Sequence, residues 1–105
     1  MLFNKKRKLL AGLFSLVILS VWSTASLAKD WDDCAHERDR DLSTRACTRI
    51  INSGNESARN LAIAYSNRGN NHRFRKDNDL ALADYERAIK LDSKYASPYI
   101  GRGNV

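Results

Sequence analysis

The chain has 105 residues, of which 18 are basic and 12 acidic, and its formal net charge is +6. This length fits one small domain with a limited core rather than several domains. A basic balance can indicate nucleic-acid binding. However, four of the 18 basic residues lie together at positions 5–8, which leaves fourteen basic against twelve acidic residues in the remaining chain. The charge therefore gives little support to a nucleic-acid role.

The first 28 residues have the organisation of a secretory signal peptide. The basic head at 5–8 precedes an uncharged, mostly apolar run from Leu9 to Trp22, and Ser26-Leu27-Ala28 supplies small residues where a signal peptidase cleaves. We therefore predict cleavage after Ala28 and an exported chain, periplasmic or secreted. The alternative is an uncleaved anchor, because residues 9–28 are uncharged and just long enough to span a bilayer.

Cys34 and Cys47 are the only two cysteines in the chain. Export would place them where disulfides persist, and a domain of this size usually gains from a cross-link. We predict that they form a disulfide, which contributes about 3 kcal/mol in the chain-entropy model. The alternative is a pair of buried free thiols, since two cysteines alone do not indicate a metal site.

Residues 29–40 are highly charged and lack a sustained apolar period. We expect an irregular or short helical leader, held by Cys34 and by packing of Trp31, its one large apolar residue. If Trp31 were exposed it would instead be a candidate binding anchor, because Trp is enriched at interface hot spots. The acidic residues within 30–33 lack the spaced ligands and turn glycine of a calcium loop. We therefore predict a solvated surface there and no metal.

Residues 41–52 carry apolar or small side chains at three- and four-residue spacings, which predicts an amphipathic helix. The segment also aligns with residues 79–89 at an offset of 38, with Cys47 at the place of Tyr85. We interpret residues 29–56 as a cysteine-containing leader and a degenerate repeat helix. Gly54 suits a left-handed helix end, and Asn55 or Ser57 can cap the next helix.

Two further helices and the start of a third follow in chain order. The same periodicity predicts one helix from Ala58 to about Phe74 and another from about Leu80 to Leu91. The polar residues 75–79 form the turn between them, with a cap at position 77 or 78. Pro98 then falls in the first turn of a helix within residues 96–105, where its missing amide costs little.

Part of this pattern recurs after 34 residues. The recurring residues are Ala62, Tyr65, Arg68 and Gly69, which return as Ala96, Tyr99, Arg102 and Gly103. Self-similarity at this period is typical of helix-turn-helix solenoids, in which each unit buries its apolar face by stacking on the next.

The pattern resembles the tetratricopeptide repeat (TPR) family, of an exported bacterial type, with one full repeat at residues 62–95. The positions that match the family signature are Tyr65, Gly69, Ala81, Tyr85 and Ala88, with Tyr99 and Gly103 in the second unit. Arg68, His72 and Ser93 stand where Leu, Tyr and Pro are usual. The resemblance implies an all-α fold, a short helical-hairpin solenoid of about four helices after the signal peptide. Residues 57–95 would form the TPR hairpin, and residues 96–105 the first helix of an incomplete second TPR.

The sequence contains no acid pair, nucleophile elbow, zinc spacing or phosphate loop. We therefore predict that the protein is not an enzyme and uses no cofactor or metal. In tetratricopeptide proteins the first helix of each repeat lines a groove, which implies binding residues on the side away from Tyr65 and Gly69. These candidates are Ile63, Ser66, Asn67, Asn70, Arg73, Phe74 and Asn104.

Amide side chains in such a groove can hydrogen-bond an extended peptide, and Arg73 can pair with a carboxylate. The alternative is that these positions are ordinary solvated residues. The resemblance implies a non-catalytic adaptor of the cell envelope that binds another protein or a peptide, without nucleic acid, and touches the membrane only through an uncleaved signal segment. The alternative function is a truncated solenoid that self-associates into a homo-oligomer through its uncapped C-terminal repeat.

Overall fold

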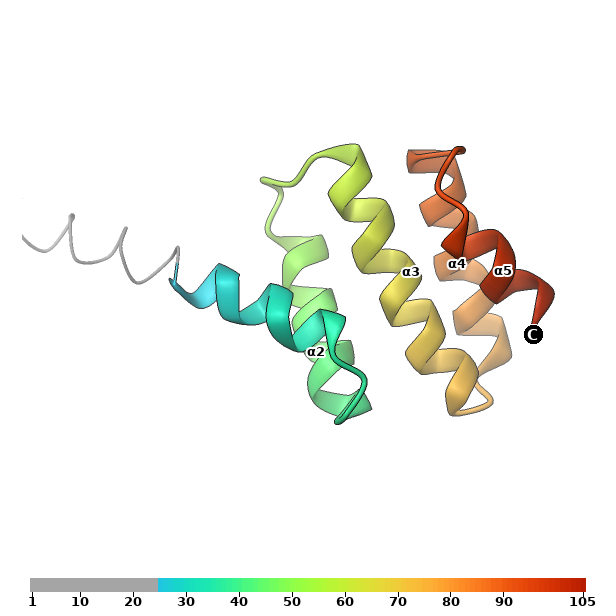
Figure 1. Cartoon of the computed structure of the whole chain (residues 1–105), viewed down its shortest axis with the longest axis horizontal. Helices are drawn as coiled ribbons and strands as arrows, with labels where there is room; N and C mark the ends of the chain where they lie inside the picture. The colour runs from blue at the N-terminus through green and yellow to red at the C-terminus, as the bar shows by residue number, and fades with distance from the viewer. Residues whose placement is uncertain (1–24) are drawn as a thin grey trace, which may run out of the picture.

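The computed structural model describes residues 25–105 and shows an all-helical chain (Figure 1). An N-terminal helix over residues 25–35 is followed by α2 (Arg40–Asn52), α3 (Ala58–Phe74), α4 (Asn78–Leu91) and α5 (Ser97–Gly103). The helices pack in sequence as two antiparallel hairpins and a single last helix, which confirms the predicted fold class of a short helical-hairpin solenoid. The count differs from about four because the charged leader, predicted to be irregular or a short helix, is helical.

The predicted signal peptide lies mostly outside the described residues. Only its last four residues, 25–28, are described, and they are helical. No helix found between residues 25 and 105 is long and apolar enough to span a membrane.

Local capping explains where the helices begin. The Asp39 side chain accepts a hydrogen bond from the Leu42 amide at the start of α2 (3.1 Å), and Ser57 accepts one from the Asn60 amide at the start of α3 (3.1 Å). Each bond satisfies an amide that has no partner within its helix. Between them, Gly54 adopts a φ of 75°, as expected for a left-handed helix end.

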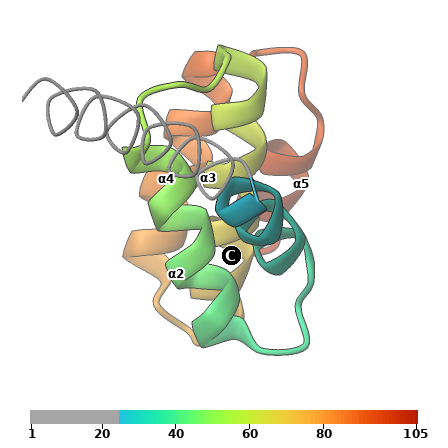
Figure 2. The ribbon, with the colours of Figure 1, turned by 90° about the vertical axis from the view of Figure 1, so that its left-hand side faces the viewer.

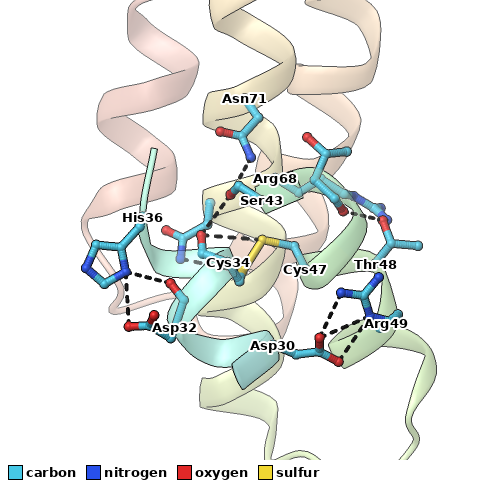
Figure 3. Close-up of a disulfide and its surroundings, with 12 residues drawn as sticks. Asp30, Asp32, Cys34, His36, Ser43, Cys47, Thr48, Arg49, Arg68 and Asn71 are labelled. Atoms are coloured by element: carbon cyan, nitrogen blue, oxygen red, sulfur yellow. Dashed lines mark hydrogen bonds and ion pairs between the residues drawn. A yellow bond between two sulfur atoms is a disulfide. The ribbon is translucent and has the colours of Figure 1, made fainter. Parts of the chain in front are cut away.

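The first hairpin is cross-linked by the predicted disulfide between Cys34 and Cys47 (Figure 3). Around it lies a small apolar cluster completed by Ala46, Ile50 and Ala64, against which Leu27, Trp31 and Ile51 pack. The Trp31 indole N–H donates to Glu56 (3.1 Å), so this tryptophan packs inside the fold as expected. A bidentate pair between Arg49 and Asp30 further ties the N-terminal helix to α2 (2.8–3.2 Å).

The second hairpin is organised around the fully buried ring of Tyr85 on α4. A Cβ placed on Gly69 of α3 would lie 2.8 Å from the Cε1 atom of this ring, and one placed on Gly101 of α5 would lie 2.5 Å from the same atom. The ring is therefore held between two glycines. Gly103, the predicted counterpart of Gly69, has no such neighbour within 4 Å. In the second unit it is thus Gly101 rather than Gly103 that permits the close approach to Tyr85.

An ion-pair network lies beside this ring, at positions where the repeat pattern usually has apolar residues. The Asp84 carboxylate is 1% exposed and accepts two hydrogen bonds from Arg68 (2.7 and 2.8 Å) and one from Arg87 (3.1 Å). The hydrogen bonds to Asp84 raise the pKa of Arg68, against the opposing effect of burial. His72 Nε2 lies 3.7 Å from the same carboxylate. The departures at Arg68 and His72 are therefore explained by one buried acidic partner on α4.

Candidate functional site

The N-terminal helix and α5 lie on one side of the row of helices, with α2 and α4 on the other and α3 between them (Figure 2). This arrangement gives α3 neighbours on both flanks. The predicted binding residues of α3 therefore fall into two groups. Two of them contact neighbouring helices, and the others are at least partly exposed to solvent.

The two residues used inside are Ser66 and Asn67. Ser66 is fully buried, and its hydroxyl lies 3.1 Å from the Ser97 hydroxyl at the start of α5. The prediction that Ser66 lines an open groove is therefore wrong, because α5 packs over this position. Asn67 is half-buried and donates from Nδ2 to the Cys34 sulfur (3.9 Å). This contact fastens α3 to the disulfide of the preceding hairpin.

Asn70 and Arg73 come together at the hydroxyl of Tyr85. This hydroxyl donates to Asn70 Oδ1 (2.6 Å), and Arg73 Nε donates to the hydroxyl oxygen (3.3 Å). The Tyr85 ring itself is enclosed between Gly69 and Gly101, so its hydroxyl holds both side chains in fixed positions. Tyr85 was predicted only as a residue of the repeat signature; neither its spacing nor its type indicated that its hydroxyl would position Asn70 and Arg73.

The tyrosine bond leaves part of each polar group available. With Oδ1 of Asn70 accepting from Tyr85, its Nδ2 group remains as a donor. Arg73 has no carboxylate within 4 Å in the part of the chain that the structure describes, and both residues are partly exposed. The result is a fixed amide donor next to a guanidinium without an acidic partner.

Two apolar side chains on α3 flank this polar pair. Ile63 is half-buried, and Phe74 is 65% exposed with the Arg40 guanidinium 3.4 Å from its ring centroid. We name Ile63, Asn70, Arg73 and Phe74 together the α3 face. Asn104, the repeat counterpart of Asn70, is exposed at the end of α5, and no contact brings it to the α3 face.

A separate hollow of about 370 Å³ lies where the N-terminal helix turns into α2. Its lining residues are mainly charged: Asp32, Asp33, His36, Arg38, Asp39 and Leu42. His36 Nδ1 is engaged with the backbone oxygen of Asp32 (2.6 Å), one helical turn away. Throughout residues 25–105, no group of three or more His, Cys, Asp or Glu side chains is arranged to hold a metal ion.

The comparison with protein families agrees with the hairpin geometry. Residues 62–95 match the tetratricopeptide repeat model. The match begins within α3 and ends just beyond α4, so the matched segment contains both the α3 face and the Tyr85 ring that supports it. Comparisons with curated proteins and with solved structures gave no match.

TPR hairpins generally mediate protein–protein interactions and are typically non-catalytic. The match places residues 62–95 among hairpins with this general role. It also gives the α3 face a place in the repeat, on the first helix of the matched hairpin.

Proposed function

We propose that the protein is a non-catalytic adaptor of the cell envelope that binds an extended, acidic segment of another protein on the α3 face. The observation that carries the proposal is the pairing of Asn70 and Arg73 through the buried Tyr85 hydroxyl. Side chains already held in one geometry lose little conformational freedom when a ligand binds, which favours affinity.

The chemistry of the α3 face defines the segment that it would bind. The Nδ2 group of Asn70 can donate to a backbone carbonyl of an extended chain, and the Arg73 guanidinium can pair with a carboxylate. Ile63 and Phe74 lie along the same helix and offer apolar contact to neighbouring side chains of the ligand. A short segment with one acidic residue beside an apolar one fits these groups.

The envelope location rests on the predicted signal peptide and is supported by the disulfide. Structural disulfides persist in oxidising compartments and are rare in the cytosol. An exported chain cross-linked between Cys34 and Cys47 is consistent with both features. Fractionation of cells that express a C-terminally tagged chain, with mass determination of its N-terminus, tests this part; a full-length chain in the cytosol would contradict it.

The binding site can be tested by photo-crosslinking in cells. A photoreactive phenylalanine analogue at Phe74 changes an exposed aromatic residue only slightly, and the same analogue at exposed Glu86 on α4 is the matched control. We expect a defined crosslinked protein from position 74 and none of the same mass from position 86. Adding Arg73→Gln should reduce that product at least about fivefold, because a charge-assisted hydrogen bond is lost.

Two results would contradict the proposal. One is an identical product from positions 74 and 86. The other is a product from position 74 whose yield does not change with Arg73→Gln while the variant remains folded by circular dichroism.

A further inference from the structure

Helix α5 carries a second copy of the residues with which α3 holds α4. On α3, Gly69 faces the Tyr85 ring and Arg68 pairs through two nitrogens with the buried Asp84. Tyr65 lies beside them, with the Arg68 guanidinium 5.4 Å from its ring centroid. All three residues of α3 are thus covered or half-covered by the helix that packs on them.

The counterparts on α5 have the same internal arrangement but are more exposed, and the Tyr99 hydroxyl donates to the Ser93 backbone oxygen (3.0 Å). The Arg102 guanidinium lies 5.3 Å from the Tyr99 ring centroid, close to the value on α3. Tyr99 is 39% exposed, Gly103 has no neighbouring atom within 4 Å of an added Cβ, and no carboxylate within residues 25–105 lies within 4 Å of Arg102. We name Tyr99, Arg102 and Gly103 the α5 face.

The opposite side of α5 is fixed to the fold. Gly101 lies against the Tyr85 ring, Pro98 is buried, and the Ser97 hydroxyl meets that of Ser66. These contacts hold the helix in place independently of the α5 face. The α5 face is therefore presented on a supported helix.

We propose that the α5 face docks an acidic amphipathic helix of a partner protein, with a carboxylate that pairs with Arg102. The occupant is defined by the chemistry of α4, which meets the same three residue types on α3. On that helix, Asp84 is flanked by the small buried residues Ala81 and Ala88. Charge complementarity selects the acid: a helix with a neutral or basic residue at this position would bury the Arg102 guanidinium without a partner, which is costly.

The absence of a side chain at Gly103 sets the second requirement. On α3, the glycine admits the ring of Tyr85, so the docking helix should place a large side chain one residue after its acid, over Gly103. This site differs from the α3 face in its residues and in its ligand, a helix rather than an extended segment. Its test is therefore independent of the proposed function.

A peptide with the sequence of residues 77–92 is a direct probe of the α5 face. Isolated helices of this length are marginal in water, so a lactam between Glu86 and Lys90, both exposed and one turn apart, should hold it helical. We expect saturable binding to the oxidised full-length chain by calorimetry. An otherwise identical peptide with Asp84→Asn should bind about tenfold more weakly, because the charge-assisted pair with Arg102 is lost.

Two variants of the chain locate the binding site. Arg102→Gln should lower the affinity for the unsubstituted peptide by a similar factor. The variant should then bind the unsubstituted peptide and its Asp84→Asn form with equal affinity. Gly103→Leu should abolish binding by filling the space over the glycine, while the free chain has room for the added side chain. Arg45→Gln, at an exposed arginine of α2, is the matched control and should leave binding unchanged. Circular dichroism confirms that each variant is folded.

Three outcomes would overturn the proposal. The first is no binding of the lactam peptide at millimolar concentration. The second is equal binding by the unsubstituted peptide and its Asp84→Asn form, or equal binding by the parent chain and Arg102→Gln. The third is self-association of the chain without peptide that Arg102→Gln or Gly103→Leu abolishes, since a second copy would then be the occupant.

Discussion

Replacing each of three glycines by alanine should separate packing from helix propensity in this fold. In a helix interior, Gly→Ala alone is expected to stabilise by about 1 kcal/mol. At Gly69 and Gly101 the new methyl group would meet Cε1 of the Tyr85 ring at 2.8 and 2.5 Å, well inside van der Waals contact. Overpacking of a tight core costs about 1–3 kcal/mol.

The Tyr85 ring cannot easily move away from either methyl group. It is enclosed by glycines on two helices, and its hydroxyl is bonded to Asn70 and Arg73. The cost of overpacking should therefore exceed the gain in helix propensity, with a net loss of about 1–2 kcal/mol for Gly69→Ala and for Gly101→Ala. Gly103→Ala meets nothing within 4 Å and should be neutral or stabilising by less than about 1 kcal/mol.

Urea unfolding followed by far-UV circular dichroism measures these differences. For a small protein, a loss of about 1–2 kcal/mol lowers the midpoint by about 1 M. A double-mutant cycle with Tyr85→Leu adds a check, because removing the ring should remove most of the cost of Gly101→Ala. Equal midpoints for Gly101→Ala and Gly103→Ala, or an unchanged cost of Gly101→Ala in the Tyr85→Leu background, would refute the packing argument.

Three further predictions concern the cross-link and two acidic residues. Serine at both Cys34 and Cys47 should lower the free energy of unfolding by about 3 kcal/mol, measured by urea titration; a midpoint that neither the variant nor reductant changes would contradict a stabilising disulfide. Asp84→Asn should cost about 3–5 kcal/mol, because it leaves Arg68 beside the core without its charged partner; a loss below about 1 kcal/mol by the same titration would show that the pair is dispensable. The hydrogen bond from Arg59 lowers the pKa of Asp92, so this carboxylate stabilises the fold above the unfolded-state pKa of about 4 and its contribution is lost as the pH falls below that value. The difference between the thermal midpoints of the parent chain and Asp92→Asn should therefore stay constant at neutral pH and shrink as the pH falls below about 4; a difference that does not change with pH would rule the contribution out.

The helical hairpins could be predicted from the sequence because local signals specify them. Apolar spacing placed α3 and α4 close to their observed bounds, Gly54 indicated the left-handed turn, and the 34-residue repeat indicated stacking. The two cysteines of a chain predicted to be exported were enough to predict their bond. Each of these inferences depends on neighbours in sequence or on a fixed period.

The parts that could not be predicted depend on pairs brought together by packing. In the sequence, Arg68 differs from the leucine that is usual at its repeat position, but nothing indicates which acidic residue pairs with it. Its partner Asp84 is one of several charged residues on a predicted helix. Ser66 was expected in the groove because periodicity gives the side of a helix but not which neighbour covers it. The register of α5 over Tyr85 decided that Gly101 rather than Gly103 meets the ring.

The N-terminal helix includes residues on both sides of the predicted cleavage site, and this has a consequence for biogenesis. Residues 26–28 are already helical, and Leu27 packs against the cluster around the disulfide. Proteases cut segments that are exposed or have opened. If the predicted site is used, a peptidase has to reach the emerging chain before this helix docks. A chain that oxidises and folds first would keep its apolar leader, so the relative speed of processing and of Cys34–Cys47 bond formation would divide the protein between released and tethered forms.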